Sequence, residues 1–71
     1  MIEMISVSSS NIRAIGYDPD NLILQIKFHD GSVYQYRNVP SFIFDSFLRA
    51  GSKGQYANAH IYKNYPSRKI S

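Results

Sequence analysis

The chain has 71 residues, a formal charge of +3 at neutral pH and no cysteine. A chain of this length forms one small domain, so most of its apolar side chains must serve a single core. The absence of cysteine excludes a disulfide scaffold, a thiolate metal site and a cysteine nucleophile. With only two histidines and five carboxylates spread along the chain, the sequence predicts no metal site and no cofactor.

The first residues, MIEMISVSS, show no clear apolar period. We expect residues 1–9 to be flexible or weakly ordered, either as a frayed end or as a weak extra strand, and residues 10–70 to form the domain. The start lacks the basic leader and apolar run of a signal peptide, and no stretch approaches the roughly 20 apolar residues of a membrane span. A cytoplasmic monomer without a membrane partner is therefore expected.

Three strand-like segments follow, at residues 11–17, 22–28 and 32–38. They are rich in β-branched and aromatic residues, and in LILQIKF apolar and polar residues alternate as in a half-buried strand. Pro19 and Asp20 suit a two-residue turn, which would set Ile15 opposite Leu24. The pattern predicts a three-stranded antiparallel meander.

The second turn of the meander decides which way Tyr34 and Tyr36 point. A two-residue Asp30-Gly31 loop would place both tyrosines on the outer face, beside polar residues. A three-residue loop, with Gly31 in the left-handed bulge position, would set Ile26 opposite Tyr34 and collect the apolar side chains on one face. A one-residue slip reverses every side chain, so we favour the register that separates apolar from polar groups, which places the tyrosines in the core.

Residues 40–50 are typical of a helix that covers this face. Pro40 fits a helix start and Gly51 suits the position after the end. Three apolar residues share one side at helical spacing, namely Phe44, Phe47 and Leu48. The consecutive apolar residues at 42–44 leave a strand open as an alternative.

The last third of the chain predicts a second, shorter helix over residues 54–62, capped by Ser52 and ended before Pro66. Residues 67–70 form either a short edge strand or a flexible end. The predicted fold class is therefore α+β: a three-stranded antiparallel meander packed against a helix, followed by a second short helix and possibly a short C-terminal strand.

Charge is unevenly distributed along the chain. Residues 1–45 carry three basic and five acidic side chains, a sum of −2, whereas residues 46–71 carry five basic side chains and no acid, a sum of +5. Such asymmetry points to an anionic partner. Basic groups that neutralise phosphates and aromatic rings that stack on bases are the components of an RNA-binding surface, and the C-terminal third interleaves the two. The candidate RNA-binding residues are Lys53, Tyr56, His60, Tyr62, Lys63, Tyr65, Arg68 and Lys69. The alternative is a solvated basic end whose tyrosines cover the helix.

Several short motifs occur together in order: Phe28-x-x-Gly31, Tyr34-x-Tyr36, Val39-Pro40 and Ser52-x-Gly54-x-Tyr56-x-Asn58. In this order they resemble the KTSC domain, named for its occurrence at the C-terminus of some lysyl-tRNA synthetases. The resemblance covers about residues 8–70. It implies a bacterial or phage domain that occurs alone or attached to larger proteins, with RNA binding suggested; this chain looks like the stand-alone form.

Within the motif we expect Tyr34, Tyr36, Ser52, Gly54 and Asn58 to have structural roles. Ala57 stands where the family usually has an aromatic residue, which weakens a stacking role for that segment. No nucleophile with a base and no catalytic carboxylate pair is present, so we do not expect an enzyme. The competing hypothesis is a protein-interaction module that docks on another polypeptide through the exposed edge of the meander.

Overall fold

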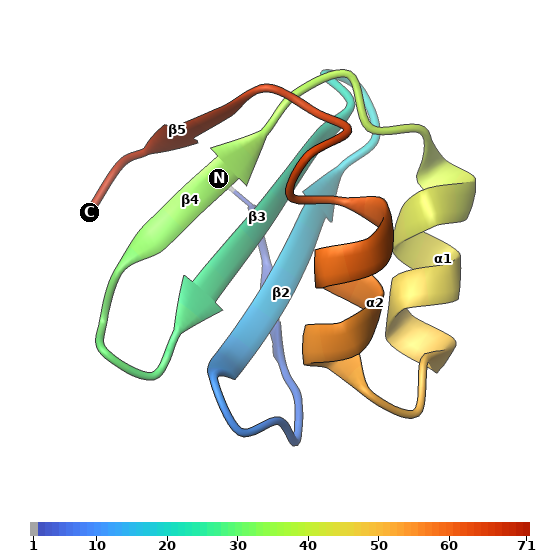
Figure 1. Cartoon of the computed structure of the whole chain (residues 1–71). Helices are drawn as coiled ribbons and strands as arrows, with labels where there is room; N and C mark the ends of the chain where they lie inside the picture. Colours follow the sequence, from blue (N-terminus) through green and yellow to red (C-terminus); the bar gives the residue numbers. More distant parts are fainter. Residues whose placement is uncertain (1) are drawn as a thin grey trace.

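Five strands form one antiparallel sheet, and two helices lie against it (Figure 1). The computed structural model describes residues 2–71. Its elements are β1 (Met4–Ser6), β2 (Ile12–Asp18), β3 (Ile23–Phe28), β4 (Val33–Tyr36), α1 (Ser41–Arg49), α2 (Lys53–His60) and β5 (Ser67–Lys69). The strands lie in the sheet in chain order. The α+β class, the central meander and the two helices are confirmed.

The β3–β4 hairpin adopts the three-residue turn. Ile26 pairs with Tyr34 and Leu24 with Tyr36. The amide of Phe28 donates to the carbonyl of Ser32 at 2.9 Å, and Gly31 has a φ of 93°, a conformation that glycine adopts without a steric cost. The register that groups the apolar side chains is therefore the one present; it buries Leu24, Ile26 and Tyr36 and leaves Tyr34 half-buried on the same face.

The predicted register of the β2–β3 turn is wrong by two residues. Ile15 pairs with Ile26, where Leu24 was expected. The Asp18 carboxylate accepts hydrogen bonds from the backbone amides of Asp20 and Asn21 at 3.0 and 3.3 Å, and this holds a longer loop in place of a two-residue turn. A shift of two residues leaves every side chain on its predicted face, so the core is unaffected.

The meander is extended on both sides. At the N-terminus, Met4–Ser6 forms the extra strand that was one of two alternatives, and it pairs with β2. Met1 lies outside the described residues. At the other side Ser67–Lys69 forms the predicted return strand and pairs with β4. Both edges of the three-stranded meander are thus already paired within the chain.

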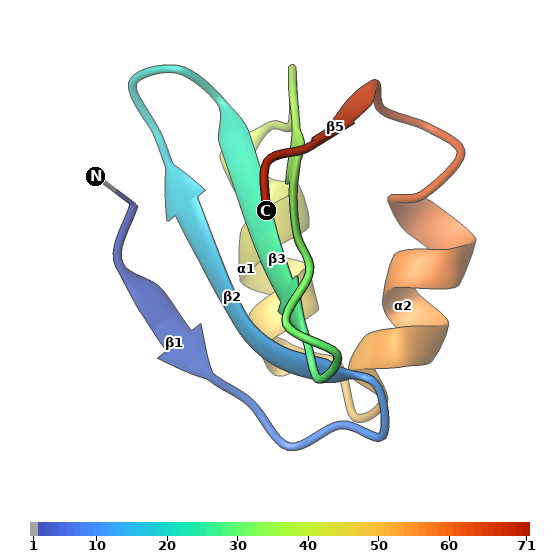
Figure 2. The ribbon, with the colours of Figure 1, turned by 90° about the vertical axis from the view of Figure 1, so that its left-hand side faces the viewer.

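Both helices pack on the same face of the sheet, and β1 lies at the edge far from α2 (Figure 2). Residues 41–49 are helical, so the alternative of a strand at residues 42–44 is wrong. Phe47 of α1 and Ile61, the residue after α2, are fully buried against the sheet residues Ile15 and Ile26. By contrast Phe42, on the outer side of α1, is 65% exposed. The apolar faces of the helices therefore close the core from one side only.

The opposite face of the sheet carries polar side chains and the N-terminal segment. The side-chain amide of Gln35 donates to the Gln25 oxygen at 2.8 Å. Gly16 of β2 lies directly under the segment at residues 2–4, and a Cβ added there would stand 2.5 Å from the carbonyl oxygen of Glu3. The first residues of the chain therefore cross the sheet at a point where no side chain intervenes.

Candidate nucleic-acid interface

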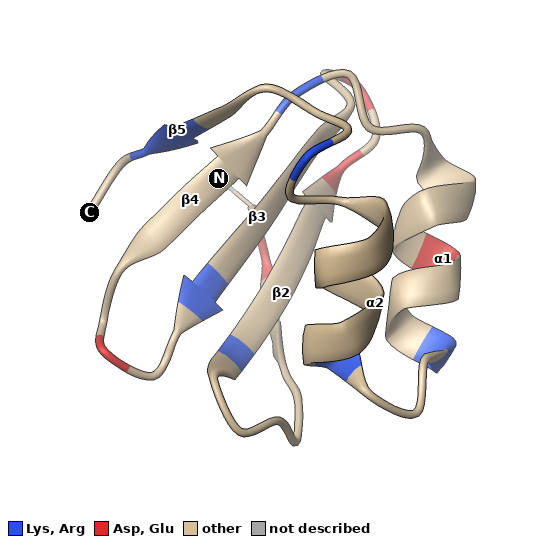
Figure 3. Cartoon of the chain, viewed as in Figure 1, with Lys and Arg blue, Asp and Glu red and all other residues tan. Residues whose placement is uncertain are grey.

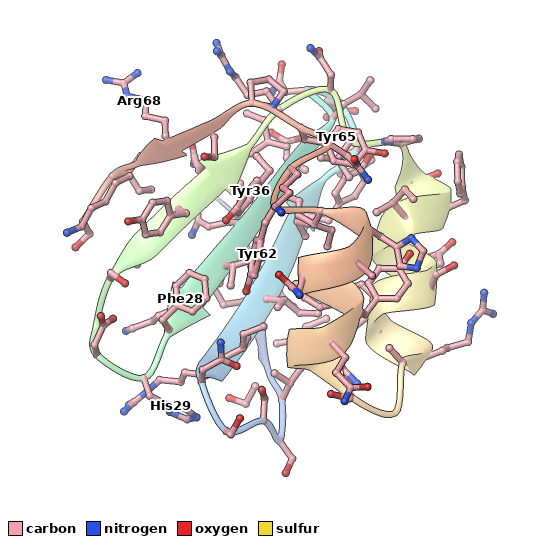
Figure 4. The ribbon with its side chains drawn as sticks, viewed as in Figure 1. Phe28, His29, Tyr36, Tyr62, Tyr65 and Arg68 are labelled. Carbon is pink, nitrogen blue, oxygen red and sulfur yellow. The ribbon has the colours of Figure 1, made fainter. Side chains whose placement is uncertain are left out.

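Four aromatic rings contact one another on the part of the sheet beside α2. They are Phe28 at the end of β3, Tyr34 and Tyr36 of β4, and Tyr62 after α2; we call them the aromatic cluster. The ring centroids of Phe28 lie 5.8 Å from those of Tyr34 and 6.4 Å from those of Tyr62, and Tyr36 and Tyr62 are 6.1 Å apart. Figure 4 shows Phe28, Tyr36 and Tyr62 in the opening between β4 and α2.

The cluster is only partly covered. Tyr36 is 5% exposed and belongs to the core, as expected, whereas Phe28, Tyr34 and Tyr62 are half-buried. In the view of Figure 1, α2 lies beside β2, and β4 and β5 lie farther from both helices. Each of these three residues is therefore partly exposed to solvent, as a ring that stacks on a base must be.

Strand β5 places its two cations on opposite faces of the sheet. Lys69 pairs with Tyr34 and shares the face of the aromatic cluster, whereas Arg68 pairs with Gln35 on the polar face. Figure 4 shows Arg68 pointing away from the labelled rings. The positive charge of Lys69 also helps to lower the pKa of Asp30, although the main cause is the hydrogen bond from the Ser32 hydroxyl.

Three of the eight candidate RNA-binding residues lie on the α1 side of α2. The Tyr56 ring stacks on Phe47 at 5.5 Å, and its hydroxyl donates to the carbonyl of Ile43 at 3.4 Å. His60 lies beside it, with ring centroids 4.6 Å apart. Lys53 donates from Nζ to the Ala50 carbonyl at 2.6 Å. Tyr56 therefore links the two helices, because its ring packs on Phe47 of α1.

Three other candidates, Tyr62, Lys63 and Tyr65, lie in the connection between α2 and β5. Tyr62 and Tyr65 are half-buried and pack against the core, and Lys63 between them is exposed. Figure 3 shows the basic segments near both ends of α2, at the end of α1 and on β5. The structure thus places Tyr62 in the aromatic cluster and Lys69 on the same face of the sheet, with Lys63 and Tyr65 in the connection between α2 and β5. It separates these residues from Tyr56 at α1 and from Arg68 on the polar face.

Next to the cluster is a polar groove with a volume of about 570 Å³, within the usual range for small-molecule sites. Its lining residues are Ser10, Asn11, Ser52, Gly54, Gln55, Asn58 and Tyr62. Three of these, Ser52, Gly54 and Asn58, belong to the motif that was expected to be structural. Sequence reasoning missed Ser10, Asn11 and Gln55; the first two come from the segment just before β2, more than 40 residues before the start of α2.

Two motif residues have clear local causes. The Ser52 hydroxyl accepts a hydrogen bond from the Gln55 amide at 3.3 Å, which makes it the cap of α2. Gly54, on the first turn, is in close contact with Asn11: a Cβ at Gly54 would stand 3.1 Å from the Asn11 oxygen. The glycine therefore lets the Asn11 side chain lie against the start of α2. The glycine of the Ser-x-Gly motif marks a close contact at this position, but only the fold shows that Asn11 is the contacting residue.

Tyr62 links the groove to the aromatic cluster. Its hydroxyl is buried and has no hydrogen-bond partner with acceptable geometry among residues 2–71. Burial raises the pKa of the Tyr62 hydroxyl, and the nearby Asn11 side chain partly offsets this by lowering it.

The raised pKa of the Tyr36 hydroxyl leads to a prediction of how the free energy of unfolding depends on pH. Burial raises the pKa of Tyr36 to about 12, with smaller contributions from Tyr62 and Tyr34. In the unfolded chain the same group titrates near 10.0. Between these pH values the unfolded state binds fewer protons, so the free energy of unfolding should fall as pH rises, by at most about 1.4 kcal/mol per pH unit for this group.

Urea denaturation at pH values from about 9 to 12 measures this slope. Tyr36→Phe removes the titrating group and keeps the ring, so its unfolding free energy should fall less steeply in this range. Some slope should remain, because the pKa of Tyr62 is raised as well. An equally steep profile in the Phe variant would contradict the assignment.

Among residues 2–71, no three histidine or acidic side chains are grouped so that they could hold a metal ion. Within the same range, neither helix has the length and apolar character needed to cross a bilayer.

Comparison with known proteins gives consistent results. The model of the KTSC domain matches residues 8–65. A crystal structure of a KTSC domain protein from Yersinia pestis superposes with a TM-score of 0.94 at 42% identity and covers all of both chains. A protein from Tsukamurella paurometabola is 46% identical over 58 residues, which are 82% of this chain and 87% of that protein.

A longer relative also matches. A lysine-tRNA ligase from a Nostoc species is 31% identical over 68 residues, which are 96% of this chain and only 12% of the ligase. The match thus covers a segment about the size of one small domain within a much larger protein. Because the family model matches most of the chain and the fold agrees throughout, this chain belongs to the KTSC domain family.

Proposed function

We propose that this chain is a non-catalytic domain that binds single-stranded RNA at the open side of the aromatic cluster. The observation that carries the proposal is the contact between Phe28, Tyr34 and Tyr62, three half-buried rings on one face of the sheet. Bases of a single strand stack on such rings without regard to sequence, at about 1 to 3 kcal/mol per base.

The charges beside the cluster support an anionic partner. Lys69 shares the face of Tyr34, and Lys63 is exposed in the connection that also carries Tyr62. A strand that stacks on the rings would have its phosphates within reach of these ammonium groups, whose contacts supply affinity independent of sequence. The name of the Nostoc relatives, lysine-tRNA ligase, includes an RNA substrate, which is a further reason to test RNA first.

The test compares two neighbouring cations, Lys69 and Arg68, that lie on opposite faces of the sheet. The binding of a fluorescent single-stranded RNA of about 12 nucleotides is followed by anisotropy at several salt concentrations. Lys69→Glu should weaken binding several-fold and reduce the slope of log K against log salt by about 0.7, the value for one phosphate on a single strand. Arg68→Glu changes the net charge equally on the polar face and should have a much smaller effect.

The aromatic contribution is tested with Tyr34→Leu, which keeps an apolar side chain on the sheet. It should weaken RNA binding about fivefold or more, because one stacking platform is lost. Circular dichroism of each variant verifies that the fold is kept. Equal effects of Lys69→Glu and Arg68→Glu, together with unchanged binding by Tyr34→Leu, would overturn the proposed surface.

The alternative hypothesis, a protein-interaction module that docks through the exposed edge of the meander, has less support from the structure. Docking through the edge of the meander would require an unpaired β2 or β4, and these strands are paired with β1 and β5. RNA binding therefore remains the proposal that the contacts favour.

A further inference from the structure

The polar groove beside the aromatic cluster is not needed for stacking, yet Tyr62 lines both. A strand that stacks on the cluster would therefore pass its next nucleotide over the groove. We propose that the groove receives one unpaired base of the bound RNA, adenine in preference to uracil, and reads its polar edge. This inference rests on the proposed function and adds a base preference to it.

The lining chemistry suits a neutral, hydrogen-bonding ligand. Three of the seven lining side chains are carboxamides, those of Asn11, Gln55 and Asn58, and none of the seven is charged. A carboxamide places a donor beside an acceptor, which matches the amino group and ring nitrogen of adenine; Asn and Gln make this paired contact with adenine in nucleic-acid complexes. Single-stranded RNA exposes these base edges to proteins.

The placement of the amides is fixed by the fold. The Asn11 oxygen accepts from the Ser9 hydroxyl at 3.3 Å, and its side chain lies against Gly54. This arrangement leaves the Asn11 amino group as a donor. Asn58 lies on α2 and is exposed at the groove, one turn beyond Gly54. The groove is therefore lined by amides from two parts of the chain, the segment before β2 and the helix α2.

A phosphate would fit the groove less well than a base. The nearest cation, Lys53, donates its ammonium to the Ala50 carbonyl at 2.6 Å, at the connection between the helices. The buried Tyr62 hydroxyl lies near the Asn11 side chain but makes no hydrogen bond of acceptable geometry among residues 2–71, and the ring nitrogen or exocyclic group of a base would offer it a further partner. A neutral ligand satisfies this group without bringing a second charge.

The test uses two RNAs of about 12 nucleotides, one of uridines only and one with a single central adenosine. Wild-type protein should bind the adenosine-containing RNA about fivefold or more tightly than oligouridine, as expected for one paired base contact. Asn58→Ala should lose this preference and keep its affinity for oligouridine, because the aromatic cluster is unchanged. Asn64→Ala removes the same chemical group at the other end of α2, outside the groove, and should keep the preference.

The outcomes separate the two proposals. If oligouridine binds but adenosine adds nothing, or if Asn58→Ala keeps the preference, the groove inference is wrong and the proposed function stands. If neither RNA binds the folded wild-type protein, both are wrong.

A second measurement identifies the chemistry of the ligand without RNA. Titration with adenosine, which has no phosphate, should shift the backbone amide signals of Asn11, Gly54 and Asn58 in NMR spectra of the wild-type protein, and inorganic phosphate should not. Shifts at these amides with inorganic phosphate and none with adenosine would make the groove an anion site and overturn the inference.

Discussion

Replacing Phe47 with alanine is expected to remove most of the stability of the protein. Phe47 is fully buried, and it joins three parts of the structure: its own helix α1, the ring of Tyr56 on α2, and the sheet below. A buried Phe→Ala change costs about 3 to 5 kcal/mol, through lost transfer free energy and the cavity left behind. A domain of 71 residues has only about 4 to 10 kcal/mol in total, so the change should remove roughly half of the unfolding free energy or more.

Thermal and urea denaturation followed by circular dichroism measure this loss. Phe42→Ala is the matched control, since it deletes the same ring from the same helix at a position that is 65% exposed. Its unfolding free energy should change by less than about 0.5 kcal/mol, as for other surface changes. Similar losses for the two variants would mean that α1 does not pack on the sheet through Phe47.

Gly16→Ala is expected to detach the N-terminal strand. The new methyl group would stand 2.5 Å from the Glu3 carbonyl oxygen and 2.7 Å from the Ile2 side chain. Because the nearest atom is backbone, the clash cannot be relieved by a side-chain rotation, and the segment at residues 2–6 must move away. We expect a loss of about 1 to 3 kcal/mol, typical of overpacking, and rapid hydrogen exchange at the amides of β1.

Gly51→Ala supplies the control for this change. A Cβ added at Gly51 meets no atom within 4 Å, so stability and exchange should stay near those of the unchanged protein. If Gly16→Ala keeps slow exchange in β1, the N-terminal segment does not cross the sheet at Gly16. The rest of the sheet should keep its protection in either variant, since β2 remains paired with β3.

Much of the fold could be predicted because the local sequence patterns and the packing of the core favour the same arrangement of the strands. The alternation in LILQIKF and the His-Asp-Gly turn select one hairpin register, since only that register buries Tyr36 with Leu24 and Ile26. The β2–β3 loop could not be predicted in the same way. Its length depends on hydrogen bonds to the Asp18 carboxylate and on a left-handed residue at Leu22, with φ of 56°, a conformation that leucine rarely adopts.

The candidate interface could be predicted only in part, because residues that interleave in sequence need not share a surface. Tyr56 and His60 are four positions apart on α2 and face α1 together, whereas Tyr62, beyond the helix end, turns to the sheet. The polar groove could not be predicted from the sequence for another reason. It depends on the approach of Asn11 to Gly54, a contact between residues 43 positions apart that no local pattern contains.

The shortness of the outermost strands has a consequence for self-association. A sheet edge offers free amides and carbonyls to which a strand of another molecule can add, and long apolar edges of this kind lead to fibrils. Here one edge is a fully exposed three-residue strand that carries Arg68 on one face and Lys69 on the other. A second copy adding at that edge in antiparallel fashion would bring like charges together over a very short ladder, so repulsion and shortness both disfavour aggregation through this edge.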